Sequence, residues 1–268
     1  MMRTAILAPI HNSLYARLVA NALVKEEGIE LRAIAVRSHW NLKRARGEFR
    51  RDGTRLVKKV IDKYLLGDKR FTGQSSGNNL YAAAQQTEMR YPSLKDIARE
   101  NQIPCRQVAD FNQQDCIAFL RDQAPHVILF TGGGLVREDL LAIPQLGVLN
   151  CHSGILPNYR GMDVVEWTAA EKNIRTVGFG ATLHFMDSGV DTGPILLTRP
   201  LERMPGDTFT LIRERIEALM LDLMLEGVRG LRDGSISAGP QDKEAGRQYY
   251  VMHARMRAYA QKNLAGAG

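Results

Sequence analysis

Residues 147–161 read GVLNCHSGILPNYRG, and this segment decides how the rest of the chain is interpreted. Its apolar beginning predicts a buried strand that ends around Asn150 and His152. Alternate side chains of a strand point to the same face of a sheet, so this amide and this imidazole should lie side by side. Pro157 and Gly161 are typical of the loop that would follow. The segment therefore predicts a polar pair presented at the end of a strand.

A second segment, residues 183–194, reads LHFMDSGVDTGP. The alternation from Thr182 to Phe185 predicts another strand, and in the turn after it Gly189 and Gly193 bracket Asp191. A carboxylate is thus expected on a rigid loop.

Together these side chains suit acyl transfer. Asn150 and His152 can both donate hydrogen bonds to an oxygen that becomes negatively charged, and Asp191 can hold or take a proton. The alternative is that Asn150 is a turn residue, His152 a surface histidine and Asp191 a loop cap. That alternative is favoured for any one residue alone. The three together, framed by strands and glycines, favour a catalytic site.

The two segments resemble the signature of formyltransferases that use 10-formyltetrahydrofolate. In that family an Asn, a His and an Asp form the catalytic set, and they fall here on Asn150, His152 and Asp191. The resemblance extends from about residue 127 to residue 200 and is absent from residues 37–90. It implies 10-formyltetrahydrofolate as the formyl donor, no metal, and direct transfer to an amine without a covalent enzyme intermediate.

The site of the formyl donor is assigned on the same resemblance. A glycine run follows the predicted strand 126–131, and consecutive glycines let a backbone pass close to a flat ligand. A tight turn between a strand and a helix explains the run equally well. In related enzymes this loop lines the pterin pocket through main-chain groups. The residues assigned to the folate are Gly133, Gly134, Leu135, Val136 and Asp187, the last with the backbone that continues to Asp191.

The acceptor amine is expected beside the start of a predicted helix over residues 163–172, as in similar enzymes. The candidates are Met162, Asp163 and Trp167, although a tryptophan is more often a core residue. His184 lies inside an alternating strand, where a histidine is more often structural than a partner of catalytic residues.

The remaining pattern is that of an α/β protein. Predicted strands at residues 4–8 and 29–36 enclose an amphipathic helix, and strands and helices alternate again after an insertion. The predicted fold is a Rossmann-like, mostly parallel sheet flanked by helices (the formyltransferase fold), with a basic helical insertion and a helical C-terminal extension. The catalytic domain is expected over residues 1–203, the insertion over about 37–90 and the extension over 204–268.

Several classes of protein do not fit the sequence. The loop 9–13 after the first strand contains no glycine, so the dinucleotide-binding fingerprint is missing, as is the glycine-rich phosphate loop of purine-pathway formyltransferases. No apolar run reaches the length of a membrane span, and the apolar start is too short for a signal peptide. Cys105, Cys116 and Cys151 are an odd set without ligand-pair spacing, so neither a disulfide framework nor a zinc site is expected. A cytoplasmic location is the default expectation.

Residues 37–70 carry twelve Lys or Arg against four acids. The whole chain has a net charge of +7, so its basic character is local to this segment. Val57, Ile61 and Tyr64 recur at helical spacing, which predicts helices with a basic face. A solvated face is the simplest explanation. The others are attraction of a phosphate-bearing substrate, a nucleic acid or an anionic membrane surface.

The favoured acceptor is an amino sugar linked to a nucleotide, and it is reached by elimination. Family members that act on initiator transfer RNA carry a further C-terminal barrel, and those that hydrolyse the folate carry an N-terminal regulatory domain; neither is expected here. An amino-acid-derived amine, such as a siderophore precursor, is second. From another class, the alternative is a non-catalytic α/β protein that binds polyanions. No stable nucleic-acid partner is expected, and a homodimer is left open.

Overall fold

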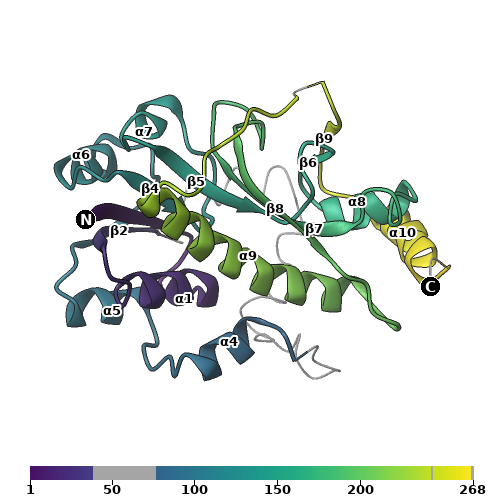
Figure 1. The fold of residues 1–268 in the computed structure, drawn as a ribbon, viewed down its shortest axis with the longest axis horizontal. Coiled ribbons are helices and arrows are strands. Elements are labelled where there is room, and N and C mark those ends of the chain that lie inside the picture. Colours follow the sequence, from purple (N-terminus) through teal and green to yellow (C-terminus); the bar gives the residue numbers. More distant parts are fainter. Residues whose placement is uncertain (39–76, 243, 267–268) are drawn as a thin grey trace.

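The computed structural model describes residues 1–38, 77–242 and 244–266 (Figure 1). A seven-stranded sheet lies at its centre. The strands of this sheet are β1 (Met2–Ala8), β2 (Ile29–Arg37), β3 (Cys105–Val108), β4 (Val127–Phe130), β5 (Gly147–His152), β7 (Phe179–Phe185) and β8 (Ile195–Leu201). Their spatial order is β3-β2-β1-β4-β5-β7-β8. The first five pair in parallel, whereas β7 and β8 add antiparallel strands at one edge.

Helices cover both faces of the sheet, which explains the continuous apolar runs of the central strands. On β1, Ile6 and Ala8 lie in one core and Ala5 and Leu7 in the other. The first core is closed by α1 (Leu14–Leu23), α5 (Leu94–Glu100) and α9 (Phe209–Asp233), and the second by α6 (Gln114–Asp122) and α7 (Glu138–Leu141). The predicted fold, a mostly parallel sheet flanked by helices, is confirmed.

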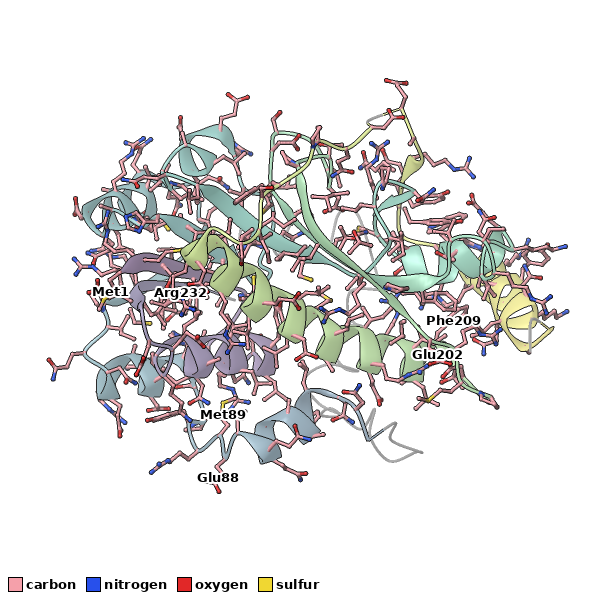
Figure 2. The ribbon with its side chains drawn as sticks, in the orientation of Figure 1. Met1, Glu88, Met89, Glu202, Phe209 and Arg232 are labelled. Atoms are coloured by element: carbon pink, nitrogen blue, oxygen red, sulfur yellow. The ribbon has the colours of Figure 1, made fainter. Side chains whose placement is uncertain are left out.

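The longest helix, α9, runs along one face of the sheet from end to end (Figure 1). Its start at Phe209 lies near Glu202, and its end at Arg232 lies near the beginning of β1 (Figure 2). The hydroxyl of Thr208 caps the helix by accepting a hydrogen bond from the backbone N–H of Leu211 at 3.3 Å. Because α9 contributes to the same core as β1, it fixes the sheet that carries the site.

A second, small sheet lies beside the main one. It pairs β6 (Tyr159–Gly161) in parallel with β9 (Arg247–Tyr249). Nearby, α8 (Val164–Ala170) packs against α10 (Ala254–Gly266). The predicted C-terminal extension is therefore helical in α9 and α10 but also contains a strand. The division of the chain at residue 203 stays a prediction.

Three strands, β6, β8 and β9, were not predicted from the sequence. The first and last are three-residue strands that exist only through their pairing with each other, and β8 is an edge strand that contains a proline. The basic helices expected within 37–70 lie almost wholly outside the described residues. The described end of the expected insertion holds a short helix, α4 (Leu80–Gln86), capped by Asn79.

Within the described ranges, none of the helices combines the length and the apolar character needed to cross a membrane.

Candidate active site

The pairing of β5 with β7 brings the first polar residues of the site together. The antiparallel register sets Asn150 opposite His184 and His152 opposite Thr182. Asn150 and His152 are alternate residues of β5, so they share a face, while Cys151 between them lies in the hydrophobic core. Burial raises the pKa of the Cys151 thiol, so this group is not a thiolate nucleophile at neutral pH.

Asp191, on the loop after β7, holds this polar cluster together. Its Oδ2 lies 3.3 Å from Nδ1 of His152 and accepts a 2.9 Å hydrogen bond from the backbone N–H of Gly161. Its Oδ1 accepts a longer bond of 3.4 Å from Nδ2 of Asn150. The backbone of Asp191 has a φ of 54°, which is uncommon for a residue with a side chain and is often found at functional sites. The structure thus brings together the three residues predicted to be catalytic; their role stays a prediction.

Both ring nitrogens of His152 face hydrogen-bond acceptors. Nε2 lies 2.8 Å from the carbonyl oxygen of Tyr159, and Nδ1 faces Asp191. Burial lowers the pKa of His152 below its usual value, and the nearby carboxylate opposes that shift without cancelling it. The resting ring is therefore neutral at pH 7, with one N–H for two acceptors. A second proton taken up during a reaction would find an acceptor already in place.

Asp191 is a carboxylate at neutral pH. Burial raises its pKa, but the neighbouring imidazoles of His152 and His184 and the N–H of Gly161 outweigh burial and lower the pKa to about 2. A negative charge thus lies beside the neutral His152 ring, where it can stabilise a proton that arrives there.

His184 supports Asn150 from the neighbouring strand. Its Nδ1 lies 2.8 Å from the carbonyl oxygen of Phe185 and donates to it, and its Nε2 lies 3.1 Å from Nδ2 of Asn150 and 3.5 Å from Oδ1 of Asp191. The side chain is only 1% exposed. Its place in an alternating strand favoured a structural role for His184, and this contact with Asn150 was not predicted from the sequence. The only signal for it was the register of β5 against β7, which alternation alone does not give.

The glycine run lies at the carboxyl end of β4, next to the end of β5, because these strands pair directly. Gly132, Gly133 and Gly134 have φ angles of 115°, 123° and 116°, values that favour glycine. A Cβ atom on Gly133 would lie 2.7 Å from the ring of Phe111. The loop is therefore built for glycine at successive positions, and it presents backbone rather than side chains.

The other residues assigned to the folate lie close to these two loops. Leu135 is 74% exposed, whereas Val136 is buried in the core beneath α7. Oδ1 of Asp187 accepts hydrogen bonds from the hydroxyl of Thr192 at 2.6 Å and from the backbone N–H of Gly189 at 3.0 Å. Asp187 thus shapes the loop after β7. Contact of these residues with a folate stays a prediction.

The acceptor candidates gather at the start of α8. Met162 is 55% exposed. The carboxylate of Asp163 accepts a 2.8 Å bond from the backbone N–H of Met252, and Nε1 of Trp167 donates a 2.9 Å bond to the carbonyl of Tyr250. Asp163 and Trp167 therefore tie α8 to the segment after β9, and their part in acceptor binding stays a prediction.

Two further contributors were not identified from the sequence. They are the backbone N–H of Gly161, which donates to Asp191, and the side chain of Gln241, whose Nε2 donates to the carbonyl oxygen of Asp191 at 3.1 Å. Both come from segments that meet the site only through tertiary structure, so no local pattern signals them.

No group of three or more His, Cys, Asp or Glu side chains in the described part of the chain is arranged to hold a metal ion.

Comparison with known proteins gives matches in sequence and in structure. A family model described as formyl transferase matches residues 73–228. The chain is 32% identical over 152 residues to the methionyl-tRNA formyltransferase of Pelobacter propionicus, and 30% identical over 150 residues to that of Thermotoga maritima. Each alignment covers 56% of this chain and 47% of the relative. The chain thus spans about half the length of the curated relatives it matches.

Solved structures share the fold over nearly the whole chain. The phosphoribosylglycinamide formyltransferase of Anaplasma phagocytophilum superimposes with a TM-score of 0.58 at 16% identity, covering 93% of this chain and 99% of that one. A sugar N-formyltransferase from a Shewanella species gives a TM-score of 0.56 at 14% identity, covering 98% and 88%. At such identities the likeness concerns the fold alone.

Proposed function

The chain belongs to the formyl transferase family, and on that premise we propose that it transfers a formyl group from 10-formyltetrahydrofolate to the primary amine of a small acceptor. The observation that carries this proposal is the cluster of Asn150, His152 and Asp191 beside the glycine loop. Both lie at the carboxyl ends of neighbouring strands, where open α/β sheets bind their ligands.

The glycine loop fits the flat ring system of the formyl donor. Its backbone carries no side chains over Gly132–Gly134, and the exposed Leu135 adds an apolar surface next to it. When bound, the donor supplies the formyl carbon and the nitrogen, N10, that leaves it. The residues that would hold it are Gly133, Gly134, Leu135, Val136 and the backbone that begins at Asp187.

In the proposed reaction the amine nitrogen bonds to the formyl carbon, and the bond from that carbon to N10 breaks. Asn150 donates to the oxyanion that develops on the formyl oxygen. Its bond to Asp191 is long, at 3.4 Å, so this N–H is the one that can turn toward the substrate. The carboxylate of Asp191 takes up the proton that the amine loses, directly or through water, beside the neutral ring of His152, and passes it to the leaving nitrogen.

For the acceptor we favour an amino sugar linked to a nucleotide, with an amino-acid-derived amine second. A sugar N-formyltransferase and ribonucleotide formyltransferases share this fold, so the fold accommodates amines of that size. Because the match to the methionyl-tRNA enzymes covers about half of their length, their acceptor is not carried over. A non-catalytic polyanion-binding protein is the competing function, and it predicts indifference to the loss of Asp191.

Calorimetric titration tests the proposal directly. The protein is titrated with a stable analogue of 10-formyltetrahydrofolate, and then with a panel of nucleotide-linked amino sugars and amino-acid amines. We expect saturable binding of the analogue and binding of at least one amine that is then formylated in the presence of the true donor. A folded protein that binds no folate analogue would overturn the proposal.

The matched control replaces one aspartate at the site and one far from it. We expect Asp191→Asn to lower turnover by about 10²- to 10⁴-fold, and Asp222→Asn, on the exposed side of α9, to leave it unchanged. Equal turnover in the two variants would remove Asp191 from the reaction and favour the polyanion-binding alternative.

A further inference from the structure

The segment that follows α9 returns past the site and contacts the start of β8, the loop that carries Asp191, and β6. At Gly239 it pairs with Ile195 at the start of β8 through two backbone hydrogen bonds of 2.8 Å. Further on, β9 pairs with β6, whose Gly161 donates to Asp191. The segment itself lies beyond residue 228, where the match to the family model ends.

Gln241 lies between these two anchor points and reaches the loop that carries Asp191. Its Nε2 donates to the carbonyl oxygen of Asp191 at 3.1 Å and also to that of Gly193. One carbonyl belongs to Asp191 itself, whose backbone has a φ of 54° and whose carboxylate faces His152, and the other to Gly193, two residues later. The side-chain amide of Gln241 thus binds the backbone of this turn, while the carboxylate of Asp191 contacts His152.

The geometry requires a donor at this position. Both groups in front of the side chain are carbonyls, which only accept hydrogen bonds, so Nε2 must face them. Oε1 consequently points away and finds no partner among the described residues. Neither a carboxylate nor an apolar side chain of the same size would replace the contact.

We propose that Gln241 is a positioning residue for the formyl transfer, which fixes the backbone of Asp191 so that its carboxylate stays against His152 and Asn150. The expected effect of Gln241 on turnover rests on the proposed function, whereas its expected effect on the positions of Asp191 and His152 does not. If the loop relaxes, the carboxylate moves away from His152. Because that carboxylate raises the pKa of His152 against the effect of burial, the pKa must then fall.

The test uses Gln241→Leu, which removes the donor without changing charge, in the full-length chain. Titration of His152 is followed by NMR, and turnover is measured as kcat and KM. We expect the His152 titration to shift to lower pH, and kcat to fall by about 10- to 100-fold, as misplaced catalytic groups do, with KM for the formyl donor within about twofold. Gln241→Asn keeps an amide on a shorter side chain, and we expect both effects to be smaller.

Gln248→Leu is the matched control, because Gln248 is exposed on β9 of the same segment. It should leave the His152 titration and kcat as they are. An unchanged His152 titration in both Gln241 variants, with the fold intact, would overturn the inference. A shifted titration in a protein that formylates no amine would uphold the positioning role and reject the proposed reaction, so the two failures are distinguishable.

Discussion

Asp191 and His152 form a buried pair in which one partner is charged and the other is neutral. The carboxylate keeps its charge because several donors converge on it, and the imidazole stays neutral because its burial outweighs that single charge. Because acceptors lie at both ring nitrogens of His152, a protonated ring would donate to both of them without movement of either side chain.

Removing the carboxylate charge has a defined effect on the imidazole. In Asp191→Asn the influence that raises the pKa of His152 is lost and burial is left unopposed, so we expect this pKa to fall further below its usual value of 6.5. NMR titration of the ring measures it directly. The matched variant Asp187→Asn, on the same loop, should change the pKa much less. A rise in the pKa of His152 in Asp191→Asn would show that the pair is arranged differently.

Replacing the predicted catalytic residues one at a time should separate chemistry from stability. We expect Asn150→Ala, His152→Ala and Asp191→Asn each to lower turnover by about 10²- to 10⁴-fold, because oxyanion donors and proton carriers act mainly in the transition state. Steady-state kinetics gives the loss, and thermal unfolding checks that each variant is folded. Near-normal turnover would remove that residue from the mechanism.

At the scale of elements, the start of α9 depends on a buried ion pair. Arg215 donates to both carboxylate oxygens of Asp207, at 2.5 and 2.6 Å, and each side chain is only 3% exposed. Arg215 also donates to the carbonyl oxygen of Glu202 at 3.0 Å, which connects the helix to the end of β8. The pair thus ties the first turns of α9 to the edge of the sheet.

We expect Arg215→Leu to lower the free energy of unfolding by about 3–5 kcal/mol, because the carboxylate of Asp207 is left buried without its partner. Urea denaturation measures the change. As a control, Arg99→Leu breaks the exposed pair with Asp96 on α5 and should cost at most about 1 kcal/mol. If the two variants unfold at the same urea concentration, the buried pair does not contribute as described.

Local sequence signals predicted most of the elements. The apolar runs of β1, β2 and β5 are encoded within a few residues, and these strands appear where expected. The pairing of β6 with β9 and the contact of Gln241 with the loop after β7 depend on residues far apart in the chain, so neither leaves a pattern in either segment. The same holds for the site. Motifs identified Asn150, His152 and Asp191, but the contacts that Gly161, Gln241 and His184 make with them were not predicted.

On the scale of the whole molecule, α9 and the segment after it have different structural roles. The helix packs in the core on one face of the sheet, and the segment after it pairs with β8 and β6 next to the site. The returning segment thus supports the Asp191 loop through Gln241, and binding of one ligand by this loop and the glycine loop stays a prediction.

A shortened chain tests this division. A chain that ends at Gly234 keeps the main sheet and α9 but lacks Gln241, β9 and α10. We expect it to lose at least about a hundredfold in turnover, because the groups that position Asp191 and Gly161 are gone. A chain that ends at Gly266 is the control and should behave as the full chain does. Turnover close to normal in the shorter chain would show that the catalytic residues hold their places unaided.

The pairing of β6 with β9 also has a consequence for the order in which the protein forms. Arg160 and Gly246, which meet there, are 86 residues apart in the chain, and closing so long a loop is slow compared with forming a helix. During synthesis the motif that contains Asn150 and His152 leaves the ribosome well before the strand that fastens the loop beside it. The newly made enzyme should therefore acquire its sheet first and its catalytic competence last.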